Sequence, residues 1–530
     1  MLHLMPPIKC FLRSAYQQCP RSLWSFKMSA SVDYSIDHSI TEKQASDAKM
    51  IFQAGVEAVL PGKMVKEALT VKGDKLFVGD QVYKLKRNVH IAAFGKAVVG
   101  MVSAAEHCLG DHIVSGVAST PVGLKEALQN AGKSHLWPSE FSKVEIIEGA
   151  RNNIPDENSM LAAQKIKQLA MNLCEEDILL VLISGGGSAL LPSPTPPITL
   201  QQKQNITNLL ASRGASIQEL NTVRSAVSSL KGGKLALLAR PAKIISLILS
   251  DIVGDPIELI ASGPTAPSQA TSHECLQILD KYTLPGEIHD VIRAVISQTQ
   301  PNNSTFHVDF DHVNNIIVGN NRKAVAASMK ASEQMGYSPF LLSDSICGEA
   351  REIGELYAEL AELLSKIIRA PESSSCEQLR LPDLLNSFQI SEDTCESLLA
   401  LAIGNNPVCI IGAGETTVTM QGKGMGGRNQ EMALAWAIAI QTLETKGFEV
   451  TFLCGGTDGQ DGPTDAAGAW VFPGLVSNAS AYNVSALEAL KHNDSYTFFT
   501  EYMNGNNLLK MGLTGTNVMD IQVLLIKPLV

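Results

Sequence analysis

The sequence predicts two α/β domains built on largely parallel sheets, and three observations lead to this prediction. Short apolar runs of strand length alternate with helical patterns, which is the alternation expected of parallel sheets. Most of these runs end in turns rich in Gly, Asp, Ser and Asn, and open α/β sheets bind their ligands at such strand ends. The chain has 530 residues, which is too long for a single hydrophobic core.

Composition narrows the functional class. The net charge of −11 argues against nucleic acid as a partner, because nucleic-acid binding needs a basic surface. The ten cysteines include no C-x-x-C pair, which predicts free thiols and neither a disulfide framework nor a zinc site. Apolar runs such as Ile178–Ile183 are far shorter than the roughly 18 residues of a membrane-spanning helix. We therefore expect small-molecule partners and no membrane partner, with monomer and homodimer both open.

The N-terminal segment 1–33 differs from the rest of the chain. Its basic residues all precede the first acidic residue, Asp33, and serines and apolar side chains accompany them. This composition is typical of an organellar transit peptide. An unstructured extension, with Met28 as an alternative start, is the competing interpretation. We expect a cytoplasmic or mitochondrial-matrix protein that is not secreted, and we leave this segment out of the fold prediction.

The first predicted domain, residues 45–305, begins with a helix over Ala48–Val59 that a Pro-Gly pair ends. Val89–Phe94 is a short apolar strand, and the helix Val98–Cys108 follows it almost at once. Between these two, Lys96 stands one residue past the strand, after a glycine. This position predicts that its ammonium group points to the ligand-binding edge of the sheet. An ordinary surface lysine would show the same pattern.

Ile178–Ile183 is predicted as a central strand, because it is apolar throughout. The loop that follows predicts an anion or substrate site, since its glycines expose backbone N–H groups at a helix start. Its residues are Ser184, Gly185, Gly186, Gly187 and Ser188. The loop is neither a nucleophile elbow nor a Walker A loop, because it lacks the spacing of both motifs.

Two further groups of polar residues follow in this domain. Asn221, Arg224, Ser228 and Lys231 fall on one face of a helix that we expect to run to Gly232-Gly233. Arginine clamps carboxylates and phosphates well, so Asn221, Arg224 and Lys231 are candidate substrate-binding residues. A solvated polar face is the simpler interpretation.

Asp251 and Asp255 come just after another buried-type strand, Ile244–Leu249. Two carboxylates at a strand end suit Mg²⁺, which takes carboxylate and water oxygens. Either carboxylate suits equally well the deprotonation of a substrate hydroxyl. The sequence does not rank these two roles.

The second predicted domain, residues 311–530, restarts the alternation after a linker at Pro301–Ser304. Strands are expected at Asn315–Val318, Pro339–Leu342, Val408–Ile411, Val450–Leu453 and Ile521–Ile526, and helices at Ala324–Met335 and Met432–Gln441. Residues 371–396 show no clear period, which predicts a surface insertion.

The turn Cys454–Asp465 is rich in glycine and places Asp458 and Asp461 just past a strand. Glycine lets the backbone approach a ligand closely, and the two carboxylates are candidate ligands of Mg²⁺ or contacts to a ribose. A solvated acidic turn is the simpler interpretation. The small residues of Ala466–Trp470 predict a helix after the turn.

Two enzymatic functions fit these turns. Gly422, Gly424 and Gly427 match G-x-G-x-x-G ahead of a helix, which favours an NAD(P)-dependent reductase. The match is weak, because the preceding segment is short and polar and Arg428 occupies the helix start. Phosphoryl transfer uses more of the chain, since it needs cations on the moving phosphate, carboxylates for Mg²⁺ and a group that orients the hydroxyl. A non-catalytic ligand-binding protein is a third class.

Taken together, these motifs resemble the type-2 glycerate kinases, whose C-terminal part is the MOFRL domain. The resemblance runs in order from about Ala48 to the C-terminus. It rests on Phe94-Gly95-Lys96-Ala97, Ser184-Gly185-Gly186-Gly187-Ser188-Ala189, Asn221-x-x-Arg224, Lys231-Gly232-Gly233, Ser250-Asp251-x-x-Gly254-Asp255, Ser262-Gly263-Pro264-Thr265, Gly414-Glu415-Thr416-Thr417, Gly426-Gly427-Arg428-Asn429-Gln430-Glu431 and Gly456-Thr457-Asp458-Gly459-x-Asp461-Gly462-Pro463-Thr464-Asp465.

The resemblance implies two Rossmann-like three-layer α/β/α domains with an active site in the cleft between them. It implies ATP-dependent phosphorylation of D-glycerate at the 2-hydroxyl, with Mg²⁺, in serine, fructose and glycerate catabolism. Some relatives carry a hydroxypyruvate reductase label, which keeps the reductase as an alternative.

Residue roles are expected as follows. Lys96 and Arg428 match the family's cleft lysine and arginine and stabilise the transferring phosphoryl group. Arg224 or Lys231 clamps the glycerate carboxylate, and Asp251 or Asp255 orients or deprotonates the hydroxyl. Asp458 and Asp461 hold the metal, with Asp251 and Asp255 as the alternative pair. The nucleotide is expected to contact Gly414, Glu415, Thr416, Gly426, Gly427, Asn429, Gly456, Thr457 and Asp458.

Overall fold

The computed structural model describes residues 38–268, 271–282, 286–298, 309–391, 393–404 and 406–529. The predictions for the segment 1–33 and for the linker at Pro301–Ser304 lie outside these residues. From residue 37 onward the chain forms one compact unit. Within the described residues, no helix has both the length and the apolar character needed to cross a membrane.

A six-stranded sheet has the strand order β6-β5-β4-β7-β8-β9, and all its neighbouring strands are parallel, as predicted. Its strands are β4 (Val89–Phe94), β5 (Ile113–Pro121), β6 (Val144–Gly149), β7 (Ile178–Ile183), β8 (Lys243–Leu249) and β9 (Val313–Gly319). A small antiparallel sheet of β1 (Thr70–Lys72), β2 (Lys75–Val78) and β3 (Gln81–Lys84) precedes it.

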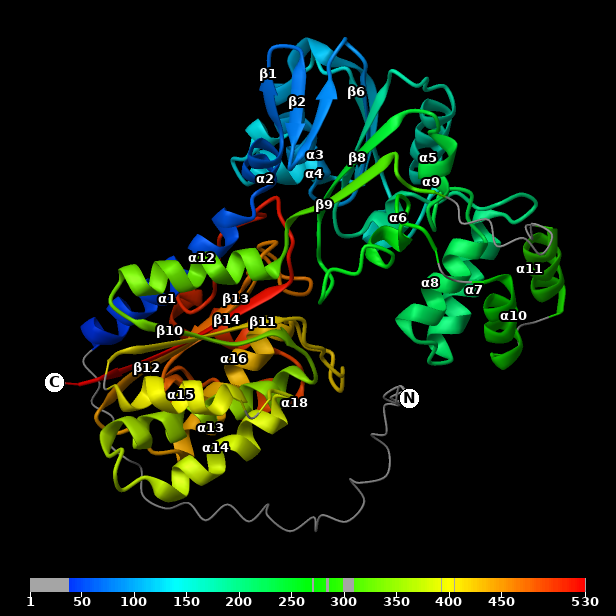
Figure 1. The fold of residues 1–530 in the computed structure, drawn as a ribbon. Coiled ribbons are helices and arrows are strands. Elements are labelled where there is room, and N and C mark those ends of the chain that lie inside the picture. Colours follow the sequence, from blue (N-terminus) through cyan, green and yellow to red (C-terminus); the bar gives the residue numbers. More distant parts are fainter. Residues whose placement is uncertain are drawn as a thin grey trace, which may run out of the picture. The chain divides into compact units, whose positions relative to one another are not determined.

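Helices cover both faces of this parallel sheet, which explains why the central strand β7 is apolar throughout. Alternate residues of β4 face opposite sides, because side chains along a strand alternate: Ile91 joins one core and Ala92 the other. The first core contains α2 (Pro61–Ala68) and α3 (Val98–Leu109), and the second contains α5 (Glu157–Met171), α6 (Gly187–Leu190) and α9 (Lys234–Leu238). Figure 1 shows these helices around the sheet.

Four helices form a separate cluster with its own small apolar core. They are α7 (Leu200–Ser212), α8 (Ile217–Ala226), α10 (Ser272–Lys281) and α11 (Gly286–Gln298). Ile206, Leu210, Val223 and Leu279 are buried in this core. The cluster matters for the site, because α7 and α8 carry basic side chains described below.

The second sheet has the strand order β10-β11-β14-β12-β13 and is mixed. Its strands are β10 (Ser338–Ile346), β11 (Val408–Gly414), β12 (Phe448–Gly456), β13 (Gly468–Val471) and β14 (Asp520–Pro528). β10 and β11 are parallel, whereas β14 lies antiparallel between β11 and β12. The final strand therefore enters the middle of the sheet, which local sequence pattern does not reveal.

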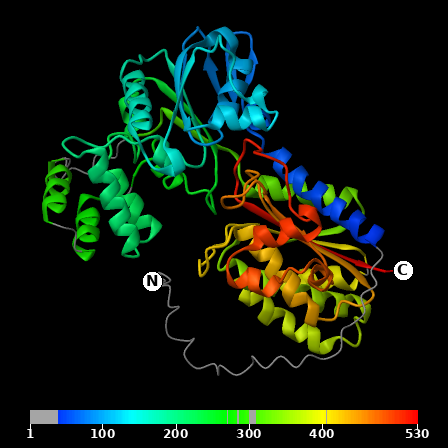
Figure 2. The same ribbon diagram turned by 180° about the vertical axis from the view of Figure 1, so that it is seen from behind.

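Helices also cover both faces of the second sheet, so it forms three layers (Figures 1 and 2). α1 (His38–Ala58) and α12 (Asn321–Gln334) pack on one face, and α13 (Ala350–Arg369) and α16 (Arg428–Ala439) pack on the other. On β12, Phe452 stacks on Trp436 of α16, while a Cβ at Gly455 would lie 2.8 Å from Phe52 of α1. The predicted class, α/β with Rossmann-like layers, is confirmed. The predicted parallel pairing is wrong for the second sheet, because only β10 and β11 pair in parallel there and the other three pairings are antiparallel.

Two elements cross the domain boundaries that the sequence predicts. Strand β9 lies beyond residue 311 but pairs with β8 in the first sheet. Helix α1 is the first element of the described residues, yet it packs on the second sheet, where Gln44 Nε2 donates to Glu449 O at 3.1 Å. Hydrophobic period identifies an amphipathic helix but not the sheet that it covers, so these placements needed the tertiary structure.

Two local predictions in the second half are wrong. Residues 371–396 are not a surface insertion, because they belong mostly to the helices α14 (Ser375–Ser387) and α15 (Asp393–Ile403), whose leucines fill the core beside α13. Leu381 and Leu385 are fully buried. Ala466–Trp470 is not a helix, because β13 pairs with β12 through Leu453 and Trp470. Pairing with a neighbouring strand overrides the weak helical preference of small residues.

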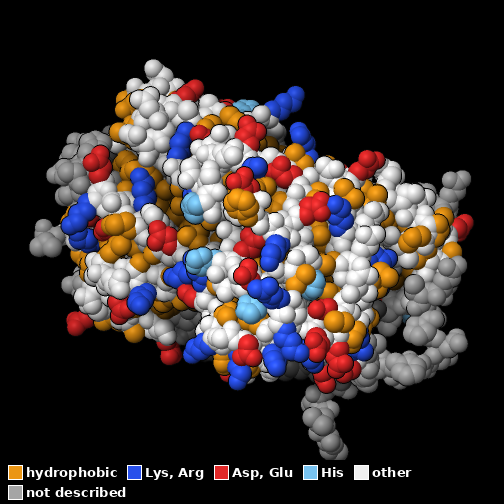
Figure 3. All heavy atoms as spheres, turned by 90° about the horizontal axis from the view of Figure 1, so that it is seen from above, with side chains coloured by type: hydrophobic (Ala, Val, Ile, Leu, Met, Phe, Trp, Pro, Cys, Tyr) orange, Lys and Arg blue, Asp and Glu red, His pale blue; other side chains and the backbone are white. Residues whose placement is uncertain are grey.

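Figure 3 shows one face of the molecule, on which Lys and Arg side chains are interspersed with Asp and Glu. No extended basic area stands out on this face.

Candidate active site

The turn after β4 and the glycine loop after β7 are tied together by hydrogen bonds. Lys96 N donates to Gly185 O at 2.9 Å, and Ala97 N donates to Ser184 Oγ at 3.0 Å. Gly95 has a φ of +146°, and a Cβ there would lie 2.1 Å from Ser184 Oγ. Only glycine permits this close approach. The turn thereby holds Lys96 at the carboxyl end of the sheet, as predicted.

Asp251 joins this group, whereas Asp255 does not. A Cβ at Gly185 would lie 2.1 Å from Asp251 Oδ2, so the glycine makes room for the carboxylate. Burial raises the pKa of Asp251 to about 6, the charge of Glu415 adds to this, and Lys96 opposes it. Asp255 instead accepts a hydrogen bond from Asn320 Nδ2 at 2.5 Å. Of the two aspartates that sequence could not rank, the structure places Asp251 near Lys96.

Arg428 begins α16 and is held by two carboxylates. Its Nε and Nη2 donate to Asp520 at 2.5 and 2.9 Å, and Nη1 pairs with Glu415 at 2.9 Å. Burial lowers the pKa of Arg428, but the charges of Asp520 and Glu415 outweigh this and raise it. A guanidinium group has five N–H donors, so these contacts leave donors for a ligand. Asp520, fully buried in β14, was not predicted as part of the site.

Asp458 lies within the electric field of both cations. Its Oδ1 accepts a hydrogen bond from Gln460 N at 3.0 Å. Burial raises the pKa of Asp458, whereas the charges of Lys96 and Arg428 lower it. Lys96 follows a strand of the first sheet, and Arg428 and Asp458 follow strands of the second. Side chains from the two halves of the chain therefore come together here.

Asp461 has a structural position that conflicts with its predicted role as a metal ligand. Its Oδ1 accepts from Asn429 N at 3.1 Å and its Oδ2 from Gln430 N at 2.9 Å. A Cβ at Gly427 would lie 2.3 Å from the Asp461 carboxyl carbon. Asp461 therefore caps the N-terminus of α16, where unpaired N–H groups and the helix dipole favour a carboxylate.

Replacing Asp461 by alanine is expected to lower the free energy of unfolding by about 1–2 kcal/mol, because a helix cap is lost. Urea denaturation of the variant and wild type measures this difference. The folded variant should need the same Mg²⁺ concentration for turnover as wild type does. A large rise in the Mg²⁺ requirement, with stability unchanged, would restore Asp461 as a metal ligand.

Most of the residues predicted to contact nucleotide are interior to the second lobe, which is the part of the chain built on the mixed sheet. Asn429 is fully buried against Asp461, and Thr457 Oγ1 donates to Met519 O at 2.6 Å. Thr416 Oγ1 is buried and makes no hydrogen bond within the described residues. Backbone contacts constrain several of the glycines, since a Cβ at Gly414 would lie 2.1 Å from Ile346 O. Their role toward a nucleotide stays a prediction.

The G-x-G-x-x-G match does not form a dinucleotide site. A Cβ at Gly422 would lie 2.2 Å from His492 O, and one at Gly424 would lie 2.3 Å from Asp494 Cβ. These glycines therefore allow the loop to pack against neighbouring backbone. The helix start that a pyrophosphate would use is already occupied by the Asp461 carboxylate.

A pocket of about 320 Å³ adjoins Lys96 and Asp458. Apolar residues make up much of its wall, among them Pro121, Val122, Leu124, Leu128 and Leu513. Asparagine side chains at 152, 153 and 517 also line it. An apolar pocket with a cation and a carboxylate at one end is the usual form of a small-molecule site.

A second pocket, of about 370 Å³, lies on the other side of the glycine loop and contains the predicted cations Arg224 and Lys231. The predicted helix is shorter than expected, because α8 ends at Ala226. Ser228 Oγ then accepts from the backbone N–H of both Leu230 and Lys231 at 3.4 Å, and such serine contacts compete with helix geometry. Lys231 nevertheless comes close to Arg224 through the turn.

A hydrogen-bond network joins this second pocket to the glycine loop. Ser188 Oγ lies 3.1 Å from Ser262 Oγ, which donates to Asn221 Oδ1 at 3.1 Å. Arg224 Nη1 donates to the same oxygen at 3.5 Å. The pocket also contains Lys203 of α7, which sequence reasoning missed. Its segment is an ordinary polar helix with no motif, so no signal was available.

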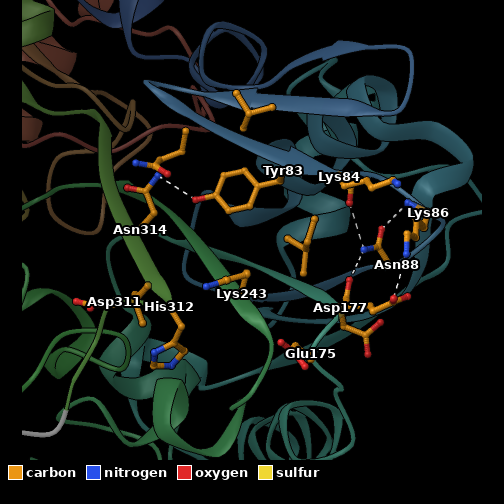
Figure 4. Close-up of a pocket in the computed structure, with 15 residues that line it drawn as sticks. Tyr83, Lys84, Lys86, Asn88, Glu175, Asp177, Lys243, Asp311, His312 and Asn314 are labelled. Atoms are coloured by element: carbon orange, nitrogen blue, oxygen red, sulfur yellow. Dashed lines mark hydrogen bonds and ion pairs between the residues drawn. The ribbon is translucent and has the colours of Figure 1, made fainter.

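The hollow in Figure 4, of about 470 Å³, is not a candidate active site. It lies at the amino ends of β4, β7, β8 and β9, whereas such sheets bind ligands at their carboxyl ends. Several of its polar groups are paired with each other, since Lys86 pairs with Glu176 at 3.0 Å and Asn314 Nδ2 donates to Tyr83 Oη at 3.3 Å.

The carboxylates near Lys96 fit a Mg²⁺ ion bound mainly by a phosphorylated ligand. Within the described residues, no three potential metal-ligating groups gather in one cluster. Mg²⁺ in phosphate-transfer sites typically needs only one or two carboxylates, with phosphates and waters completing its shell. Burial raises the pKa of Glu415, and the charges of Asp520 and Asp458 add to this. Asp458 and Glu415 are therefore the donors that suit such an ion.

Comparisons with known proteins place these features in a family. Residues 47–297 match the domain of unknown function DUF4147, and residues 408–520 match the MOFRL family. The chain is 45% identical over 489 residues to the Homo sapiens protein named glycerate kinase, covering 91% of this chain and 93% of that protein. It is 34% identical over 477 residues to D-glycerate 2-kinase of Thermotoga maritima, covering 90% and 97%. The crystal structure of a Thermotoga maritima glycerate kinase superposes with a TM-score of 0.72 at 31% identity, covering 92% of this chain and 100% of that chain.

Proposed function

The chain belongs to the glycerate kinase family, and on this premise we propose that it transfers the γ-phosphoryl group of ATP to the 2-hydroxyl of D-glycerate. The main support for the proposal is that four charged side chains from the strand ends of both sheets lie close enough for their charges to interact. They are Lys96, Asp251, Glu415 and Asp458. Phosphoryl transfer depends mainly on positioning and on stabilising the charge of the moving group. This arrangement supplies both signs of charge in one place.

Lys96 and Arg428 are proposed to stabilise the transferring phosphoryl group. Lys96 is fixed at a strand end by the glycine loop, and Arg428 is fixed by Asp520. Rigid anchoring suits this role, because preorganised charges need no rearrangement during the reaction. The mainly apolar pocket beside Lys96 is proposed to hold the nucleotide, with its phosphates toward Lys96 and Asp458.

Magnesium is proposed to enter with the nucleotide. Asp458 and Glu415 would hold it, and when bound it would neutralise charge on the β- and γ-phosphates. Asp461 is left out of this set, since both of its oxygens cap α16.

Glycerate is proposed to bind on the other side of the glycine loop, with its carboxylate toward Arg224 and Lys231. Asp251 stands against that loop at Gly185. We propose that its carboxylate accepts a hydrogen bond from the acceptor hydroxyl and receives the proton as the hydroxyl attacks phosphorus.

Replacing Asp251 by asparagine is expected to lower kcat by about 10²–10⁴-fold, the usual contribution of a general base. The kcat of the matched variant Asp255→Asn should stay within a few-fold of wild type, because the Asp255 carboxylate accepts a hydrogen bond from Asn320. Steady-state kinetics with saturating ATP and D-glycerate compare the two. Equal losses in both variants would contradict the assignment of Asp251.

One assay tests the function as a whole. Purified protein with D-glycerate, ATP and Mg²⁺ should release ADP, and phosphorus NMR of the product should show a 2-phosphoryl ester. ADP release should cease when Mg²⁺ is chelated. Hydroxypyruvate with NADH or NADPH should give no reaction, because the glycines of the G-x-G-x-x-G match pack against backbone. Reduction without ADP release would overturn the proposal, as would saturable binding of both substrates without turnover.

A further inference from the structure

The pocket lined by the glycine loop holds an unusual concentration of buried basic side chains. Lys203, Arg224 and Lys231 all line it. Lys203 is 7% exposed and Lys231 is 1% exposed. None of the described residues that line the pocket is acidic. Buried cations are normally paired with an acid, so a cluster without one indicates that an anion is supplied from outside.

Lys203 is the member of this cluster whose ammonium group receives no hydrogen-bond acceptor from the residues that the structure describes. Its Nζ is buried and makes no hydrogen bond within the described residues. By contrast, Lys231 Nζ donates to Ala261 O at 3.0 Å. A buried ammonium group without a partner is costly, and a bound carboxylate or phosphate would remove that cost.

The pocket also adjoins the group around Lys96. Gly186 lines the pocket, and a Cβ at Gly186 would lie 3.2 Å from Lys96 Cγ. Only the thickness of the glycine loop therefore separates the cation cluster from the proposed phosphoryl site. The pocket volume of about 370 Å³ is large enough for a three-carbon acid.

We propose that Lys203 is a specificity-determining residue, which binds the carboxylate of the acceptor together with Arg224 and Lys231 and makes the site select small hydroxy acids over neutral polyols. The proposal rests on the proposed function and adds to it the residue that recognises the negative charge of the acceptor substrate. A positively charged pocket rejects a neutral analogue, because that analogue leaves the buried cations unpaired.

A pH dependence follows from the surroundings of Lys203. Burial lowers its pKa to about 7, and the charges of Lys234 and Arg224 add to this. Lys231 also faces it, and burial together with the charges of Lys203 and Arg224 holds the pKa of Lys231 well below its ordinary value. The Lys234 side chain donates to Ser225 O and Ser228 O. Lys203 is therefore protonated below about pH 7 and neutral above it. The KM for D-glycerate, whose carboxylate stays ionised, should rise as pH increases through this range.

Replacing Lys203 by methionine is expected to raise the KM for D-glycerate about 10- to 100-fold, which corresponds to one hydrogen bond between charged groups. The KM for ATP and the kcat should change only a few-fold. The rise of the D-glycerate KM above pH 7 should disappear in this variant. Lys203→Arg should retain most of the affinity but lose the pH dependence, since arginine stays charged. Lys165→Met, which removes a partly exposed lysine paired with Glu145, is the control and should match wild type.

Calorimetric titration with D-glycerate separates this inference from the proposed function. If wild type binds D-glycerate and Lys203→Met does not, the inference stands even where no ADP is released. If wild type is an active kinase and Lys203→Met keeps its D-glycerate KM, the inference fails while the function stands. The inference also fails if Lys203→Met still binds D-glycerate but no longer binds inorganic phosphate or ADP. If Lys203→Met does not fold, the proposal is tested by the pH dependence of D-glycerate affinity in wild type and in Lys203→Arg. A wild-type affinity that does not change with pH refutes the proposal.

Discussion

Replacing Lys96 by alanine is expected to lower kcat on the order of 10³-fold or more, the scale found when a phosphoryl-stabilising cation is removed. The loss should appear in kcat and in kcat/KM alike, because the ammonium group acts on charge that develops in the transition state. Fold stability should change little, since the contacts that fix this turn are made by the backbone of Lys96 and Ala97. Coupled measurement of ADP release at saturating substrates gives the ratio.

Lys86→Ala is the matched control for this prediction. Lys86 also belongs to a pocket, but that pocket lies at the amino ends of the strands, and Lys86 pairs there with Glu176 at 3.0 Å. Its loss should leave kcat within a few-fold of wild type. Comparable losses in both variants, or turnover of Lys96→Ala near the wild-type value, would remove Lys96 from the proposed role.

Replacing Arg428 by methionine is expected to have two effects of different origin. The free energy of unfolding should fall by about 3–5 kcal/mol, because Asp520 would remain buried without its cation. Turnover should fall by a further factor on the order of 10³-fold, since a charge beside the moving phosphoryl group is lost. Urea denaturation and steady-state kinetics measure the two separately.

The double variant Arg428→Met/Asp520→Asn separates these effects. Removing the orphaned carboxylate should recover much of the stability but none of the activity. Arg351→Met is the control, because it too removes the cation from a buried carboxylate. That carboxylate belongs to Glu431, which is 2% exposed and which Arg351 Nη2 contacts at 2.6 Å. It should cost stability with only a few-fold loss in turnover. Recovery of turnover in the double variant would show that Arg428 acts only through stability.

The local sequence predicted the strand ends of β4 and β7 and the turns that follow them correctly. β4 and β7 begin and end at the residues predicted, because strongly apolar six-residue segments, interrupted only by His90 in β4, have few alternatives in a covered parallel sheet. The turns that follow them contain glycines at positions where a side chain would collide, as at Gly95 and Gly185. For these elements the local requirement and the tertiary requirement coincide.

Carboxylates and cations were harder to assign, because their roles depend on neighbours that are distant in the chain. Asp461 and Asp458 stand three residues apart in one turn, yet the first caps α16 and the second faces Lys96. Arg428 is matched by Asp520, which enters the sheet only because β14 inserts between β11 and β12. Lys203 carries no local signal at all.

The sequence by itself determined the parallel sheet, the glycine turns at its carboxyl edge and the position of Lys96, because apolar period and glycine geometry act over a few residues. Only the tertiary structure decided which acids meet which cations, which strands run antiparallel and where the buried lysine cluster forms. Coulomb energy and burial depend on distances in space, and contacts between residues hundreds of positions apart set those distances.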